Sequence, residues 1–172
     1  MGSKTMLAMR PQCWRQIAAV EYAEGGESSV ARLIDRQGAT AEDLAWLVQA
    51  GLLQVTAGGV AVAVQDLTPT GQIYSDVTLT DAARRLLVRD RAWLVLQVFR
   101  LHRHNGRGHP IAVLRNVSGA DDEVLRCMEA AHLVQADNPQ THEPIPLAAF
   151  TKVPARLRVR LLHRGHDYLP RT

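Results

Sequence analysis

The longest uninterrupted helical pattern in the chain covers residues 79–104. This stretch contains neither glycine nor proline and is rich in Leu, Ala and Arg, which all favour helices. One apolar stripe recurs at seven-residue spacing: Leu87, Leu94 and Leu101. Trp93 and Leu96 fall on the opposite side, so the helix is apolar over most of its circumference. Such a helix must be covered on more than one side.

We therefore expect one long helix that joins two domains. The side that carries Trp93 and Leu96 is then available for a partner, and a second copy of the chain is the simplest one. The charged run at residues 89–91 leaves an alternative, in which two shorter helices meet there.

Before the long helix, apolar positions at helical spacing predict helices over residues 11–23, 30–37 and 40–50. Short apolar and β-branched runs then predict strands over 52–56, 60–67 and 73–78. We expect the last two strands to form a hairpin with its turn at residues 68–71.

The chain after residue 104 follows the same order. Helices are expected over residues 110–116 and 120–131, followed by an irregular loop with Pro144 and Pro146. A strand over 156–162 and a short final helix over 164–169 complete the pattern.

The two halves also align residue by residue. An offset of 81 places Gly38–Gln54 on Gly119–Gln135, with seven identities in seventeen positions. The identical pairs are Gly38/Gly119, Ala39/Ala120, Glu42/Glu123, Leu44/Leu125, Ala50/Ala131, Leu52/Leu133 and Gln54/Gln135. A duplicated fold explains this match, and chance similarity in an Ala- and Leu-rich chain is the alternative. We predict a mainly α chain with small β-hairpins (α+β) in two domains, 10–88 and 89–172, with the boundary inside the helix 79–104.

Three short motifs carry a resemblance. The segment Ala50-Gly-Leu-Leu-Gln54 resembles the end of the third helix in winged helix-turn-helix proteins, and residues 79–87 resemble the segment that leaves their wing. Residues 161–169 resemble the ending of small bacterial winged-helix proteins. The two copies cover about residues 14–169. They depart from the pattern at Ala83, where the family has Gly, and at Ala131-His132, where it has Ala-Gly.

The resemblance implies that the third helix of each copy enters the major groove of DNA. The outward residues expected there do not suit base edges or phosphates. In the first copy they are Glu42, Ala45, Trp46 and Gln49, and in the second they include Asp121, Asp122, Arg126 and Glu129. Carboxylates at the start of a helix suit its dipole but repel phosphates. An outward Trp46 fits a protein contact, or packing against its own wing.

A better cationic feature lies near the C-terminus. Alternation places Arg156, Arg158 and Arg160 on one face of a strand, with Lys152 nearby. Three guanidinium groups in a row can hold a phosphate backbone without reading sequence. The alternative is a solvated strand edge that stays charged against aggregation. Arg107, Arg115 and Arg126 are expected to widen the DNA-binding surface, and plain solubility is the alternative for Arg107 and Arg115.

Charge is divided unevenly along the chain. Residues 1–78 hold 5 Lys+Arg against 8 Asp+Glu, and residues 79–172 hold 15 against 9, which together give the net charge of +3. The basic half is the candidate for nucleic acid. The lysines are Lys4 and Lys152 alone. Arginine suits bidentate phosphate contacts, although a GC-rich coding bias gives the same composition.

Other chemistry has little support in the sequence. His102, His104, His109, His163 and His166 have spacings that can chelate zinc, but no pair of thiolates accompanies them, and we expect no metal or other cofactor. Cys13 and Cys127 give no disulfide framework. Membrane spans, a signal peptide and catalytic motifs are not evident, so we expect a cytoplasmic protein without enzymatic activity.

We therefore expect a regulator or DNA-maintenance factor that binds duplex DNA, mainly through the second domain. The alternative is a tandem winged-helix scaffold that binds a protein partner through the first domain, around Trp46.

Overall fold

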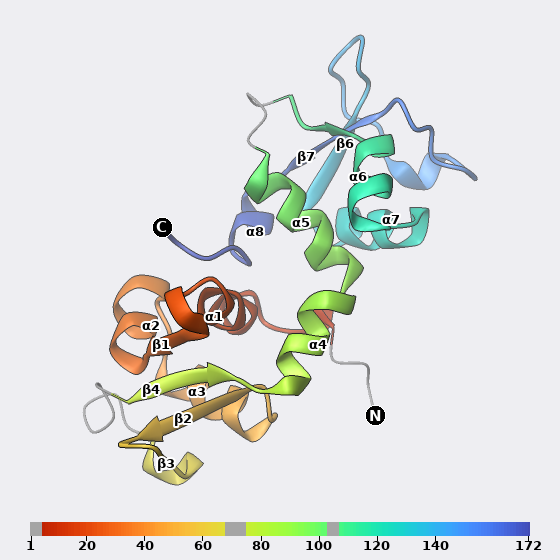
Figure 1. The fold of residues 1–172 in the computed structure, drawn as a ribbon. Coiled ribbons are helices and arrows are strands. Elements are labelled where there is room, and N and C mark those ends of the chain that lie inside the picture. The colour runs from red at the N-terminus through yellow and green to blue at the C-terminus, as the bar shows by residue number, and fades with distance from the viewer. Residues whose placement is uncertain (1–4, 68–74, 103–106) are drawn as a thin grey trace. The chain divides into compact units, whose positions relative to one another are not determined.

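The computed structural model describes residues 5–67, 75–102 and 107–172 (Figure 1). Over these residues the chain is an α+β protein with eight α-helices and two small antiparallel sheets. It divides into two compact units. The first unit comprises Met1–Arg89 together with Tyr168–Thr172, and the second comprises Asp90–Asp167. The last five residues therefore belong with the first unit, not with the segment that precedes them.

The first unit begins with α1 (Pro11–Glu21), β1 (Glu27–Ser29), α2 (Val30–Gln37) and α3 (Ala41–Gln49). It continues with β2 (Leu53–Ala57), β3 (Val60–Ala61), the 3-10 turn η3 (Val64–Asp66), β4 (Asp76–Leu79) and α4 (Asp81–Arg89). The sheet order is β1-β4-β2-β3. Helix α1 packs on α2, α3 and β4. The core between them includes Trp14, Ile17, Leu33, Leu47 and Val77, all buried.

The expected hairpin in this unit is wrong in its pairing. Strand β4 lies between β1 and β2, and its Val77 pairs with Val55. The run expected as a strand over 60–67 is extended only at β3 and then coils into η3, which packs on α3. The predicted turn at residues 68–71 lies outside the described residues.

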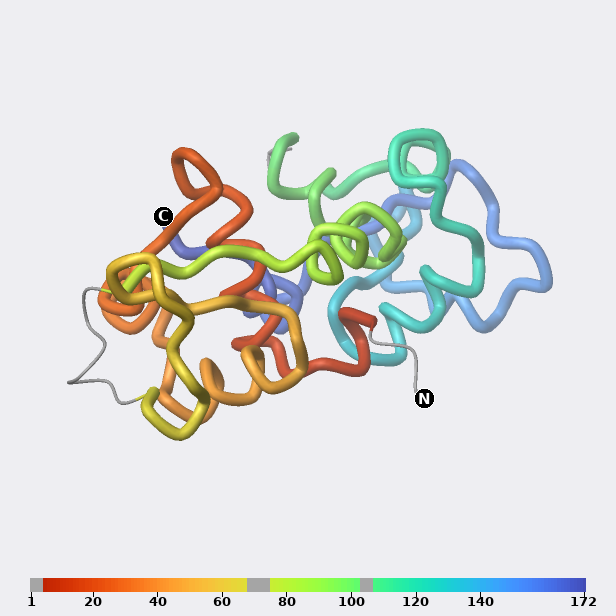
Figure 2. The backbone as a smooth tube through the Cα atoms, turned by 60° about the horizontal axis from the view of Figure 1, so that its bottom comes forward, coloured from red at the N-terminus to blue at the C-terminus, as the bar shows by residue number. Residues whose placement is uncertain are grey.

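The second unit contains α5 (Arg91–Leu101), β5 (His109–Pro110), α6 (Ile111–Ser118), α7 (Asp122–Ala130) and β6 (Val134–Asp137). The 3-10 turn η4 (Leu147–Ala149), β7 (Arg158–Leu161) and α8 (His163–His166) follow. The sheet order is β5-β7-β6, and α5 packs against α6 and α7. The long connection from β6 to β7 makes a wide blue loop in the backbone trace (Figure 2).

The predicted long helix does not form as one element. Residue 79 belongs to β4, α4 ends at Arg89, and α5 begins at Arg91. Asp90 separates the two helices with an extended backbone, and its carboxylate accepts a hydrogen bond from the Trp93 N–H at 3.0 Å. A carboxylate in this position replaces the missing backbone acceptor at the start of a helix. The alternative of two shorter helices, raised by the charges at residues 89–91, is the one that the structure contains.

The predicted repeat is confirmed at the level of local structure. Helices α2 and α6 occupy equivalent positions at the offset of 81, and so do α3 and α7. Gly38 and Gly119 end the earlier helix of each pair with a left-handed backbone, at φ of 70° and 66°. The sheet register also repeats, since Leu53 pairs with Leu79 and Val134 pairs with Leu161.

Candidate nucleic-acid interface

Strand β7 shows the alternation that the sequence predicts. Leu157 and Val159 are buried, whereas Arg160 is exposed and Arg158 is half-buried. The strand is shorter than expected, and Arg156 lies in the turn that precedes it. Residues two apart on a strand are separated by roughly 7 Å, so Arg158 and Arg160 lie next to each other on one face of β7, whereas Arg156 lies outside the strand.

Two of these arginines also bond within the unit. The Arg158 guanidinium donates from Nε to the Arg107 carbonyl and from Nη2 to the Gly108 carbonyl, each at 2.8 Å. Arg160 donates from Nη2 to Gln135 Oε1 at 2.7 Å, and its Nε lies 2.9 Å from Asp137 Oδ2. The acidic partner reduces the net charge that Arg160 presents to a ligand, whereas Arg158 bonds only neutral carbonyls in these contacts.

Three predicted contact residues are exposed and belong to segments around this sheet: Arg107, Lys152 and Arg156. Arg107 comes just before β5, and Arg156 comes just before β7, which pairs antiparallel with β5. The two arginines therefore lie toward opposite ends of the paired strands, with Arg158 and Arg160 between them. We call Arg107, Lys152 and Arg156 the basic surface.

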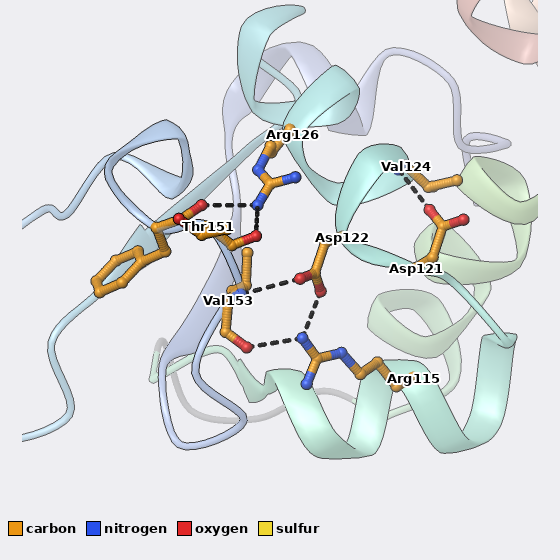
Figure 3. A network of polar contacts seen from close by, with 8 residues as sticks. Arg115, Asp121, Asp122, Val124, Arg126, Thr151 and Val153 are labelled. Carbon is orange, nitrogen blue, oxygen red and sulfur yellow. Dashed lines mark hydrogen bonds and ion pairs between the residues drawn. The ribbon is translucent and has the colours of Figure 1, made fainter.

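Arg115 and Arg126, both predicted as DNA contacts, are partly buried and bond within the second unit (Figure 3). Arg115 forms an ion pair with Asp122 and donates to the Val153 carbonyl at 2.7 Å. Arg126 donates from Nη2 to the carbonyls of Phe150 and Thr151, at 2.7 and 3.0 Å. Both guanidinium groups thus hold the backbone of the β6–β7 connection.

The carboxylates of α7 complete this arrangement. Asp122 Oδ2 accepts from the Val153 N–H at 2.9 Å, and Glu129 Oε2 accepts from the Leu147 N–H at 2.7 Å. Partial burial alone would raise the pKa of Asp122, but the hydrogen bond from Val153 and the contacts with Arg115 outweigh it and lower the pKa. We call Arg115, Asp122, Arg126 and Glu129, with the backbone atoms that they hold, the α7–loop cluster.

This cluster occupies the outward side of α7. Asp122, Arg126 and Glu129 follow one another at intervals of four and three residues, so they lie on one helix face. That face contacts the segment 147–153 in this structure. A helix covered in this way does not present these side chains to a DNA groove. The sequence shows the polar stripe itself, but nothing local in it identifies the segment that covers the stripe.

Helix α3 in the first unit is acidic at its start and aromatic further along. Thr40 and Asp43 form a capping box, and Asp43 is buried against Arg10 and Cys13. Trp46 is 42% exposed, which agrees with its predicted outward position. Glu42, one turn earlier, is also exposed.

The predicted partner face on the long helix is wrong. Trp93 is 3% exposed and Leu96 is fully buried. Helix α5 packs against α6 and α7 of its own unit, so neither side chain is available for a second copy. The pattern correctly indicated a helix covered on more than one side, and the chain itself supplies that cover.

Histidines and cysteines give no metal-binding cluster in the described parts of the chain, where no three His, Cys, Asp or Glu side chains group together. The buried His109 ring lies 3.0 Å from the His102 carbonyl and edge-on to Phe99. His104 lies outside the described residues. No helix among the described residues has the length and apolar character to cross a membrane.

The chain was also compared with known proteins. No protein family, curated protein or solved structure matches it. Function must therefore be argued from the site itself.

Proposed function

We propose that this chain is a tandem winged helix-turn-helix protein that binds duplex DNA through the phosphate backbone and serves as a regulator or DNA-maintenance factor. The element order of each unit supports the fold part of the proposal. Both units contain a helix, a short strand, two further helices, two paired strands and a final helix, in that order.

The basic surface is the observation that carries the proposal. Arg107, Lys152 and Arg156 are exposed, and Arg158 and Arg160 lie on strand β7 between Arg107 and Arg156. The second unit contains 11 Lys+Arg against 8 Asp+Glu, whereas the first contains 9 against 9. Phosphate contacts of this kind release counterions and depend strongly on salt.

Fluorescence anisotropy with a random-sequence duplex tests the proposal. We expect binding at low salt, with about 0.9 counterions released for each neutralised phosphate. Replacing Arg107, Lys152 and Arg156 by Ala should weaken binding and lower the salt slope by about 3. The matched control replaces Arg32, Arg36 and Arg85, three exposed arginines of the first unit, with the same loss of charge.

Two results would refute the DNA proposal. One is a folded wild-type chain that does not bind duplex at low salt. The other is an equal loss of affinity in the control variant, because net charge would then explain the effect without a site.

A protein-binding scaffold is the second candidate, and the surface of α3 favours it. An exposed tryptophan one helical turn from an exposed carboxylate, as at Trp46 and Glu42, suits a partner with an apolar and basic surface. A photoreactive residue at position 46 should then give one discrete cross-linked product in cells, whereas one at Arg32 should not. Absence of a product specific to position 46 would remove this candidate.

A further inference from the structure

The α7–loop cluster holds a segment that carries part of the basic surface. Lys152 is exposed, while its neighbour Val153 is buried and bonded through both backbone groups, the N–H to Asp122 and the carbonyl to Arg115. At the other end of the segment, Leu147 is buried and its N–H is held by Glu129. Arg126 holds the carbonyls between these two anchors.

All these contacts join side chains of α6 and α7 to backbone atoms of the connection. Figure 3 shows those of Arg115, Asp122 and Arg126. They therefore fix the path of the segment 147–153 whatever its side chains are. Beyond Val153 the chain stays attached to α6, since the Ala112 N–H donates to the Ala155 carbonyl at 3.1 Å. Arg156 follows directly. The result is a defined backbone from which Lys152 and Arg156 project.

Release of the segment would not produce a helix suited to DNA. The face of α7 that it covers carries Asp122 and Glu129 around Arg126, and Asp121 and Glu123 are exposed nearby. Carboxylates at that density repel phosphates. The charge pattern therefore argues against a mechanism in which the segment 147–153 leaves α7 so that this helix can read bases.

We propose that Asp122, Arg126 and Glu129 are positioning residues, which hold the β6–β7 connection so that Lys152 and Arg156 meet the phosphate backbone together. This inference rests on the proposed DNA binding and assigns a role to the helix that normally reads the groove. It assigns these three side chains no base contacts, because they bond their own chain.

Replacing Asp122 distinguishes a positioning role from an effect of charge alone, because the two predict opposite changes in DNA affinity. If this carboxylate acts only by its charge, Asp122→Asn removes a repulsion and DNA binding becomes tighter. If it is a positioning residue, the same change leaves one acceptor oxygen for two donors, the Val153 N–H and the Arg115 guanidinium, so Val153 is held less firmly and binding becomes weaker. We expect affinity to fall and the salt slope to drop by about 1, as one cation loses its phosphate.

Glu123→Gln is the matched control. Glu123 is the next residue on the same helix turn, and it is exposed. Removing its charge should leave DNA affinity unchanged or raise it slightly. Hydrogen exchange gives the second measurement, in which the Val153 amide should exchange faster in Asp122→Asn and at the wild-type rate in Glu123→Gln.

The outcomes separate the inference from the function on which it rests. Weaker binding and a lower salt slope in Asp122→Asn, with faster exchange at Val153, support the inference. Wild-type binding with equal or tighter binding in Asp122→Asn overturns it and leaves the DNA proposal standing. A wild-type chain that does not bind duplex at all overturns the DNA proposal and removes the inference with it.

Discussion

His132 occupies a backbone conformation that its counterpart in the first unit fills with glycine. At the offset of 81, His132 corresponds to Gly51, and both have a left-handed backbone with φ of 59° and 71°. The hydrogen bonds around the two positions also agree. Gly51 and His132 donate to the carbonyls of Val48 and Glu129 at 3.0 and 2.9 Å. Each pattern ends a helix in the way that glycine normally favours.

We expect His132→Gly to stabilise the second unit. A non-glycine residue in this conformation costs about 1–2 kcal/mol, and replacing it by glycine removes that cost. The greater backbone entropy of glycine in the unfolded chain opposes the gain in stability by about 0.5–1 kcal/mol. The side chain of His132 is exposed, so its removal costs little packing. The net gain is about 0.5–1 kcal/mol, equivalent to an increase in Tm of roughly 2–8 °C for a unit of this size.

The reciprocal change, Gly51→His, should destabilise the first unit by a similar amount. A Cβ at Gly51 meets nothing within 4 Å, so the backbone conformation is the dominant cost. Urea and thermal unfolding followed by circular dichroism measure both variants. A His132→Gly variant that is less stable than wild type, or a Gly51→His variant that is more stable, would refute the reasoning.

Two further predictions concern the packing of each unit. Gly108→Ala should destabilise the second unit by about 3 kcal/mol or more, because a Cβ there would lie 2.3 Å from the Val159 carbonyl oxygen at a φ of +66°. Gly58→Ala, which has a positive φ but open space, is the control in urea unfolding and should cost only about 1–2 kcal/mol; equal losses would contradict the argument. Cys13 should resist a chromogenic disulfide reagent at pH 8, because burial raises its thiol pKa to about 11, whereas the exposed Cys127 reacts quickly. Two fast thiols in the folded chain would disprove this.

The features that could be predicted from sequence are those that short segments determine. Gly38 and Gly119 mark helix ends because their residue type permits a left-handed backbone. The alternation of Arg and apolar residues around Val159 fixes which face of β7 is buried. The repeat follows from the same local signals occurring twice, and for this reason the α+β class is correct.

The errors concern contacts between residues that are far apart in sequence. Hydrophobic spacing shows that Trp93 and Leu96 need cover, but it cannot tell a neighbouring helix from a second copy. Likewise, an arginine has the same appearance in the sequence whether it bonds phosphate or, as Arg126 does, a carbonyl of its own chain. The pairing of β4 also involves distant segments, since it pairs with β1 and β2 rather than with β3.

The two positions at which the sequence departs from the predicted pattern, Ala83 and His132, have different surroundings. The first unit has Ala83 where the second has Gly165, and Ala83 is completely buried. In the second unit a Cβ at Gly165 would lie 2.6 Å from the Leu133 carbonyl oxygen. Only glycine fits there without movement of the backbone. The other departure, His132, is tolerated because its side chain points to solvent.

The duplication gives the strongest argument about the third helices. At the positions of Asp122, Arg126 and Glu129, α3 has Ala41, Ala45 and Val48, so the chemistry of this face is different in the two units. Yet η3 packs against α3, and η4 packs against α7. In both units, therefore, the connection between the paired strands packs on the corresponding helix, and in the second unit charged side chains of α7 make the contact. Because this contact persists while the residue types on the helix differ, it is a feature of the fold shared by both units.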